Sequence, residues 1–371
     1  MRITLVISTF GPGGSERAMS VMANYWAARS HDVTLITFAS KDQDFYALHA
    51  RVKRVGLGLL KASTNLIEGV RNNFARVTSL RREIVCSEPD VVICFGDITN
   101  VKTLLAASGT GLPIVVCEQI DPRQYPIGRL WNILRRLVYP RAATLVVVSS
   151  AMATGWAERI TSKNRIRVIP NPVYVSPAPL VNCENRQNQG FTIVAMGRLV
   201  RQKGFDVLLK AFSLCSDRHP KWSLDILGDG DERQTLELLK EELRLEKRVR
   251  FLGIVKEPST ILRQADLFVL SSRFEGFPLA LIEAMACGLP AISTNCPTGP
   301  SEIIQNEIDG ILVPPGDVSA LAGAMERLMD NPAERRRLAA RAVDVVERFG
   351  TNTIMTMWDD LLAHVTNATP V

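Results

Sequence analysis

The most constraining feature of this sequence is the alternation, in both halves, of short apolar runs with helical patterns. The first apolar run covers residues 2–9, a glycine-rich turn follows, and a helical pattern extends from Ala18 to Ala28. A strand followed by a helix typically pairs in parallel with the next strand, so this order predicts parallel sheets with helices on both faces. Further strand-like runs lie at residues 33–38, 91–95, 114–117, 145–148, 191–196, 223–227, 249–252, 265–270 and 310–313.

The length of the chain predicts two domains. A chain of 371 residues exceeds what one ordinary hydrophobic core accommodates. We expect the first domain at residues 1–173, a polar, proline-bearing linker at 174–190 and the second domain at 191–349. A final amphipathic pattern at about residues 350–366 predicts one more helix.

Positive charge is concentrated in the first half of the chain. The net charge of +6 divides into +10 for residues 1–170, which hold 22 Lys and Arg against 12 Asp and Glu, and −4 for the rest, which holds 22 against 26. The first half is therefore expected to face an anionic partner.

Composition also excludes several protein classes. Seven cysteines, an odd number without a Cys-x-x-Cys pair, argue against a disulfide framework and a zinc knuckle. Cys94, Cys117 and Cys287 lie in apolar contexts that predict burial. No apolar run reaches the ~18 residues of a membrane span, and the N-terminal run is short and ends in a glycine turn, unlike a signal peptide. We therefore expect a protein of the reducing cytosol.

Two glutamates frame a predicted strand–turn–helix unit in the second half. The apolar run Ala265–Leu270 predicts a buried strand, and Pro278 stands where the helix Leu279–Ala286 would begin. Glu275 precedes this helix and Glu283 lies within it. The backbone N–H groups and the dipole at a helix start favour an anion. With a carboxylate on either side to accept hydroxyl hydrogen bonds, the unit suits a sugar–diphosphate–ribose ligand.

A second candidate phosphate site lies in the same half. Arg198 and Lys203 flank a loop that leads into a helical pattern from about Phe205, and two cations beside a helix start suit a diphosphate. Asp229 and Asp231 formally match an Asp-x-Asp metal motif, but they open a predicted helix, where the dipole alone favours acids. We expect no metal site there.

The string EGFPLALIEAMACGLPAIST, which starts at Glu275, resembles the retaining glycosyltransferases of the GT-B fold with a Glu-x7-Glu signature, that is, glycosyltransferase family 4 or glycosyl transferases group 1. The resemblance extends over almost the whole chain. It implies an α/β fold of two Rossmann-like, doubly wound parallel-sheet domains that face a cleft, and a last helix that crosses back onto the first domain. The run NCPTGPSEII, from Asn295 to Ile304, resembles the subgroup that builds bacterial surface polysaccharides.

The resemblance also implies roles for single residues. Catalysis would involve Glu275 at the transferred sugar, with Arg198 and Lys203 on the donor diphosphate, and no metal or other cofactor is implied. The residues that would bind the nucleotide sugar are Glu283, at the ribose, with Gly276, Phe277, Leu279, Gly228 and Gly253.

The first half departs from the family in its acid–base chemistry. Many relatives carry a histidine near the end of the fourth strand of the first domain, where this chain reads Val116–Asp121. Either Gln119 occupies that position, or Glu118 takes part of the role. The resemblance further places Gly13 and Gly14 in a turn near the acceptor and the donor phosphates; the alternative is a tight turn and nothing more.

Two basic stretches favour a membrane surface. In residues 66–85, arginines surround an apolar pattern at helical spacing. Residues 123–141 hold five arginines and no acid, interleaved with two tyrosines and a tryptophan, which is typical of an anionic lipid surface or a pyrophosphate site. We assign this surface to Arg129, Arg135 and Arg136. The alternative is a solvated basic face on a helix that is packed by Leu130, Leu134 and Leu137.

The sequence and its resemblance to this family together imply a cytoplasmic, retaining, metal-independent glycosyltransferase that is peripheral at the inner face of the cell membrane. Its donor would be a UDP-linked hexose or N-acetylhexosamine, and its acceptor a polyprenyl-diphosphate-linked or other lipid-linked glycan of surface-polysaccharide synthesis. We expect an anionic membrane surface as a further partner and no nucleic acid. Two alternatives are a non-catalytic nucleotide-sugar-binding protein, marked by the missing histidine, and a GT-B-fold epimerase that acts on the sugar nucleotide itself.

Overall fold

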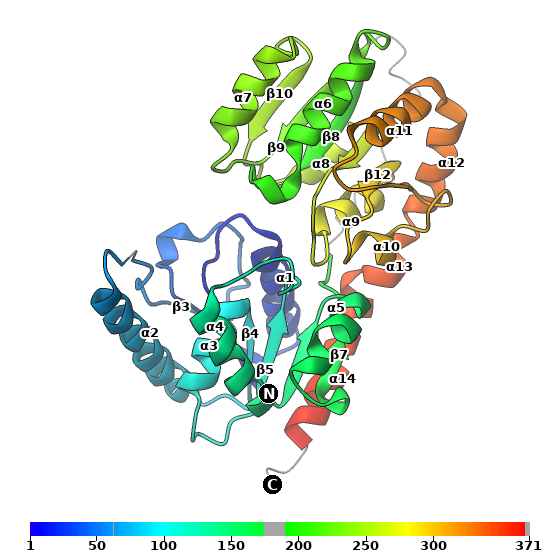
Figure 1. The fold of residues 1–371 in the computed structure, drawn as a ribbon. Coiled ribbons are helices and arrows are strands. Elements are labelled where there is room, and N and C mark those ends of the chain that lie inside the picture. The colour runs from blue at the N-terminus through cyan, green and yellow to red at the C-terminus, as the bar shows by residue number, and fades with distance from the viewer. Residues whose placement is uncertain (62, 174–189, 368–371) are drawn as a thin grey trace. The chain divides into compact units, whose positions relative to one another are not determined.

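The computed structural model describes residues 1–61, 63–173 and 190–367, so the expected linker lies outside the described residues except for Gly190. Contacts divide the chain into two units. Unit 1 comprises Met1–Pro172 with Thr351–Val371, and unit 2 comprises Val173–Gly350. Each unit is built around one parallel sheet (Figure 1).

Unit 1 holds a seven-stranded parallel sheet of order β3-β2-β1-β4-β5-β6-β7. The chain builds outward from β1 in one direction and from β4 in the other. Such a change of direction leaves a crevice at the carboxyl ends of the two central strands, where ligands bind in sheets of this kind. The strands are β1 (Arg2–Ile7), β2 (Asp32–Thr37), β3 (Lys53–Gly56), β4 (Val91–Phe95), β5 (Ile114–Glu118), β6 (Thr144–Val147) and β7 (Ile166–Val168).

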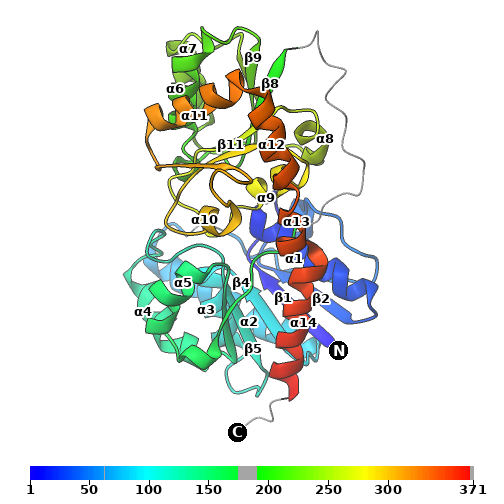
Figure 2. The ribbon, with the colours of Figure 1, turned by 90° about the vertical axis from the view of Figure 1, so that its right-hand side faces the viewer.

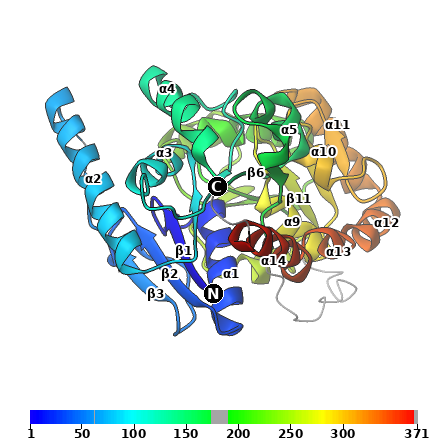
Figure 3. The same cartoon turned by 90° about the horizontal axis from the view of Figure 1, so that it is seen from below.

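Helices cover both faces of this sheet. Three of them, α2, α3 and α4, lie side by side on one face, and α1 and α14 lie together on the other (Figure 3). The helices of unit 1 are α1 (Gly14–Ala28), α2 (Leu66–Cys86), α3 (Asp97–Ala106), α4 (Arg129–Val138), α5 (Ser150–Gly155) and α14 (Thr351–Asn367), with short 3-10 turns at Lys41–Gln43, Tyr139–Arg141, Ala157–Arg159 and Lys163–Arg165.

The last helix packs into the core of unit 1. Trp358 of α14 meets Trp26 of α1 edge-on, with ring centroids 6.3 Å apart, and both rings are buried. Trp26 Nε1 donates a hydrogen bond of 2.8 Å to Asp359. The chain therefore returns from unit 2 to unit 1 before α14, which can be followed in Figure 2.

Unit 2 holds a six-stranded parallel sheet of order β10-β9-β8-β11-β12-β13, in which the direction changes between β8 and β11. The strands are β8 (Phe191–Met196), β9 (Trp222–Leu227), β10 (Val249–Gly253), β11 (Leu267–Leu270), β12 (Ala291–Thr294) and β13 (Ile311–Val313). The helices are α6 (Phe205–Ser216), α7 (Arg233–Glu242), α8 (Pro258–Leu262), α9 (Leu279–Ala286), α10 (Pro300–Ile303), α11 (Val318–Asp330), α12 (Pro332–Ala342) and α13 (Val345–Phe349), with a 3-10 turn at Arg201–Lys203.

The two parallel α/β sheets confirm the fold class predicted from the sequence. Cys94, Cys117 and Cys287 are buried, as their apolar contexts indicated. None of the helices in the described part of the chain combines the length and the apolar character needed to cross a bilayer.

Candidate active site

Most of the residues expected to bind the donor follow strands of unit 2. Arg198 and Lys203 follow β8, Gly228 follows β9, Gly253 ends β10, and the segment with Glu275 follows β11. Because all these strands run parallel, their carboxyl ends share one edge of the sheet. The structure therefore brings this set together at the edge where the crevice between β8 and β11 opens.

An ion pair joins the loop after β8 to the segment after β11. Lys203 Nζ donates to Glu275 Oε1 at 2.6 Å, and Ser272 Oγ donates to the same oxygen at 2.6 Å. Glu275 is buried and Lys203 is nearly so. Among the described residues no hydrogen bond reaches Glu275 Oε2, so this oxygen remains an acceptor for a hydroxyl group.

Two glycines let the loops at this edge touch. Gly204 adopts the left-handed conformation, with φ of 63°, and a Cβ there would overlap the Ser271 carbonyl oxygen. At Gly228, with φ of 132°, a Cβ would overlap the Gly197 carbonyl oxygen. Only glycine fits both positions, and this fit holds the loops after β8, β9 and β11 in contact.

The start of α9 faces this site with backbone groups. The helix covers Leu279–Ala286, as predicted. Pro278, which was expected at the first helical position, is the N-cap instead. The N–H groups of Leu279 and Ala280 form no backbone hydrogen bond within the described part of the chain. Gly276, Phe277 and Leu279 are buried and carry no polar side chain, so their backbone atoms are the only polar groups that they could offer a nucleotide.

Two further residues, Phe349 and Thr298, contact this turn. The Phe277 ring packs edge-on against Phe349, with centroids 5.1 Å apart. Thr298, which the sequence analysis missed, donates its hydroxyl to the Glu275 carbonyl. These two contacts support the conformation of the segment from Glu275 to Pro278.

The two remaining charged candidates differ in exposure. Arg198 is exposed, and its guanidinium forms no hydrogen bond or ion pair with any described residue. Glu283 is buried in the second turn of α9. Arg198 is thus a cation at this edge that is open to an incoming anion.

The Asp-x-Asp match lies in a turn before α7. Asp229 Oδ1 accepts a hydrogen bond of 2.8 Å from the N–H of Gly230, and α7 begins at Arg233. The described residues contain no group of three or more His, Cys, Asp or Glu side chains placed to hold a metal ion.

In unit 1, the turn after β1 contains a carboxylate that the sequence analysis missed. Gly13 is the N-cap of α1 and Gly14 its first residue. Glu16 folds back over Gly13, where its carboxyl group would collide with a Cβ, and it accepts a hydrogen bond of 2.7 Å from Thr9 Oγ1. A carboxyl group therefore lies in the turn that the resemblance placed near the acceptor and the donor phosphates.

Glu118 ends β5 inside a buried polar cluster. Tyr139 OH donates to Glu118 Oε1 at 2.5 Å, and Asn100 Nδ2 donates to Tyr139 OH at 3.1 Å. Arg135 Nε lies 3.3 Å from Glu118 Oε1, an ion pair without hydrogen-bond geometry. Burial raises the pKa of Glu118 to about 7, although Arg135 and Tyr139 act to lower it.

The structure corrects the assignment of Arg135 to an exposed surface. Arg135 is only 2% exposed, because it points inward to Glu118 and lies against the Tyr139 and Trp156 rings, at 5.9 and 5.6 Å. Arg129 and Arg136 are exposed. The alternative, a helix that is packed by Leu130, Leu134 and Leu137, is also wrong in part, because Leu130 and Leu137 face solvent.

Gln119, a candidate for the position of the missing histidine, uses both polar atoms of its side chain in hydrogen bonds within unit 1. Its side chain is buried, Oε1 accepts from Asn171 Nδ2 at 2.7 Å, and Nε2 donates to Cys117 Sγ at 3.1 Å. A neutral amide does not take up a proton at physiological pH. Gln119 therefore supplies no acid–base group.

Two family descriptions match the sequence: Glycosyltransferase Family 4 over residues 12–176 and Glycosyl transferases group 1 over residues 182–344. The GalNAc-alpha-(1->4)-GalNAc-alpha-(1->3)-diNAcBac-PP-undecaprenol alpha-1,4-N-acetyl-D-galactosaminyltransferase of Campylobacter jejuni is 30% identical over 369 residues, which cover 99% of this chain and 100% of that protein. The lipopolysaccharide 1,6-galactosyltransferase of Escherichia coli is 26% identical over 268 residues, 71% of this chain and 72% of that protein.

A solved structure shares the fold. Anabaena HepE in complex with UDP and glucose matches with a TM-score of 0.79 at 20% identity, over 98% of this chain and 99% of that one. The fold and the sequence matches together define a glycosyltransferase of the GT-B fold. The chain belongs to glycosyltransferase family 4, glycosyl transferases group 1.

We predict that Glu118→Gln changes how stability depends on pH. The pKa of Glu118, about 7 in the folded protein, exceeds the value of about 4.3 for an unfolded chain. The folded state therefore holds the proton more tightly, and this contribution is complete below about pH 4.3 and lost as the pH rises to about 7. The difference in unfolding free energy between wild type and variant should fall by about 1.4 kcal/mol per pH unit from pH 5 to 7 and then level off. Denaturant titrations at several pH values measure it, and a constant difference would contradict the assignment.

Proposed function

We propose that this protein is a retaining, metal-independent glycosyltransferase that moves a hexose or N-acetylhexosamine from a UDP-sugar to a lipid-linked, polyprenyl-diphosphate glycan. The observation that carries the proposal is the Lys203–Glu275 pair at the crevice of unit 2. It sets a cation suited to a diphosphate beside a carboxylate suited to sugar hydroxyls. The UDP and glucose bound to HepE support the donor class, and the PP-undecaprenol substrate named for the Campylobacter relative supports the acceptor class.

The proposed reaction needs little from the protein beyond charge stabilisation. The acceptor hydroxyl attacks the anomeric carbon on the face from which the diphosphate leaves, so a new carbon–oxygen bond replaces the bond to the phosphate oxygen. That phosphate oxygen takes the hydroxyl proton, and no protein base is needed. Arg198, Lys203 and the free N–H groups at the start of α9 offset the charge that develops on the diphosphate.

The other donor contacts follow from position at the same edge. Glu275 would orient the transferred sugar through Oε2, and Glu283 would bind the ribose. Backbone atoms would line the nucleotide pocket at Gly276, Phe277, Leu279, Gly228 and Gly253.

Unit 1 is proposed to meet the acceptor. The turn with Gly13, Gly14 and Glu16 would bind an acceptor hydroxyl, while Arg129 and Arg136 would meet the pyrophosphate or anionic lipid at the inner face of the cell membrane. Glu118 would position α4 through Arg135 and would not touch the substrate.

A transfer assay with a panel of donors tests the proposal. Purified protein is mixed with washed bacterial membranes and radiolabelled UDP-glucose, UDP-galactose, UDP-N-acetylglucosamine or UDP-N-acetylgalactosamine, with excess EDTA. We expect one donor to label the lipid extract. UDP binding without transfer would favour the non-catalytic alternative, and label that stays on the nucleotide in an epimerised sugar would favour the epimerase. Loss of transfer in EDTA with recovery in Mn²⁺ would overturn the metal-free mechanism.

We predict that Arg198→Ala lowers kcat by ~10²-fold or more, because it removes a charge that faces the leaving diphosphate. Stability should not change, since Arg198 is exposed. Arg201→Ala is the matched control: this arginine is also exposed, three residues along the same loop. Steady-state kinetics and thermal melting measure both. A kcat near that of wild type in Arg198→Ala, or an equal loss in both variants, would count against the role of Arg198.

A further inference from the structure

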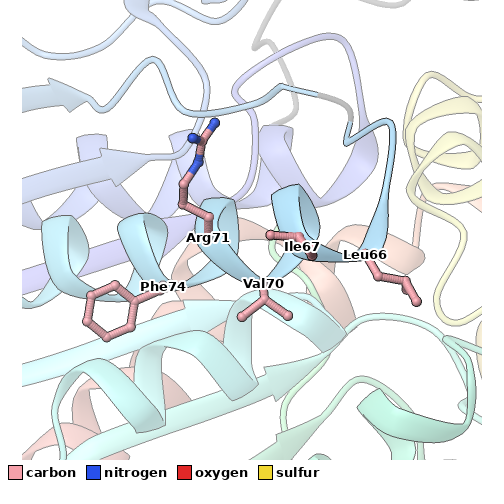
Figure 4. A pocket seen from close by; sticks show the side chains of 5 residues that line it. All are labelled: Leu66, Ile67, Val70, Arg71 and Phe74. Atoms are coloured by element: carbon pink, nitrogen blue, oxygen red, sulfur yellow. The ribbon is translucent and has the colours of Figure 1, made fainter.

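Only the C-terminal end of the apolar face of α2 is buried in unit 1. At the C-terminal end of this helix Leu80 and Ile84 are buried. At the N-terminal end the side chains of Leu66, Ile67, Val70 and Phe74 are 89%, 84%, 71% and 70% exposed. Leu66, Val70 and Phe74 project together from one side of the helix, and Arg71 projects from the other (Figure 4). The first turns of α2 thus present an apolar ridge that the described residues leave exposed.

A second apolar face points outward from α4. Leu130, Ile133 and Leu137, at spacings of three and four, are 66%, 56% and 62% exposed. One of the three arginines of this helix, Arg135, points inward to Glu118, while Leu130, Ile133 and Leu137 point outward, which an ordinary surface helix would not show. Arg129 and Arg136 flank the exposed leucines. Since α3 contacts both α2 and α4, the two faces belong to one helical layer of unit 1.

We propose that the α2 ridge (Leu66, Ile67, Val70 and Phe74) and the outer face of α4 (Leu130, Ile133 and Leu137) insert into the interfacial region of a lipid bilayer. An interfacial helix buries its apolar face among the acyl chains and sets basic side chains among the headgroups. The charges fit this partner. Helix α4 contains no acid, and the Glu68 carboxylate of α2 accepts two hydrogen bonds from Thr64.

A second copy of this chain fits these faces less well. The first half of the chain carries a net charge of +10, so a self-associated dimer would bring two strongly basic halves together. The inference deepens the proposed function, because a lipid-linked acceptor has to be reached at a bilayer. It also changes the expected salt dependence of membrane binding, because apolar insertion persists at salt concentrations that screen the arginines.

Vesicle flotation tests the insertion directly. The wild type should bind vesicles of neutral phosphatidylcholine and lose no more than about half of this binding in 1 M NaCl, where screening acts over only ~3 Å. Val70→Glu with Phe74→Glu should lower the partition coefficient by about tenfold or more. The matched control is Leu214→Glu with Leu238→Glu, two exposed helix positions of unit 2, which should bind as the wild type does.

A second pair of variants separates charge from insertion. Arg129→Glu with Arg136→Glu should weaken binding to anionic vesicles at low salt and leave most of the binding to neutral vesicles. Arg135 is left in place because its replacement would strand buried Glu118.

Several outcomes would overturn the inference. These are no wild-type binding to neutral vesicles, unchanged binding by the Val70/Phe74 variant, or an equal loss in the control. A concentration-dependent dimer in sedimentation that the Val70/Phe74 changes abolish, without any vesicle binding, would assign the ridge to a protein partner. Donor hydrolysis and transfer are measured separately. Vesicle binding without any transfer would count against the proposed function and leave this inference standing.

Discussion

The pair between Lys203 and Glu275 is the interaction on which the donor edge of unit 2 depends. Each group alone would be a costly buried charge, and removing one partner strands the other. Together they hold a cation and a carboxylate ready at the crevice between β8 and β11. The pair forms only because the loops after these strands touch, and that contact requires glycine at position 204. Under the proposed function, a diphosphate bound to Lys203 would share it with Glu275, and one ammonium group would then couple donor binding to sugar orientation.

The fold could largely be predicted from the sequence, because strand, turn and helix alternate with clear boundaries. The helix Leu279–Ala286 was placed correctly because Pro278 and Gly288 bracket it. Two strands escaped notice. β3 reads Lys-Arg-Val-Gly, and β7 has only three residues. Both lie at edges of the sheet, where a strand pairs with one neighbour only and can be short. Neither strand therefore has the long apolar run by which the central strands were recognised.

The site could be predicted only as far as strand order determines it. The family resemblance grouped Arg198, Lys203 and Glu275 without a structure, and the parallel strands explain why residues so far apart in sequence reach one edge. Side-chain direction could not be predicted. Arg135 and Arg136 are neighbours in sequence yet about 100° apart around α4. The one that points inward, Arg135, pairs with the buried carboxylate of Glu118 on β5, which the sequence of α4 does not reveal. The backward fold of Glu16 likewise depends on Thr9.

A crystal structure with bound UDP tests the central claim most directly. The account predicts the diphosphate at the carboxyl edge of the unit 2 sheet, with Lys203 Nζ about 2.7–3.2 Å from a phosphate oxygen. Diphosphate bound at the turn before α1, or anywhere that leaves Lys203 paired with Glu275 alone, would contradict it.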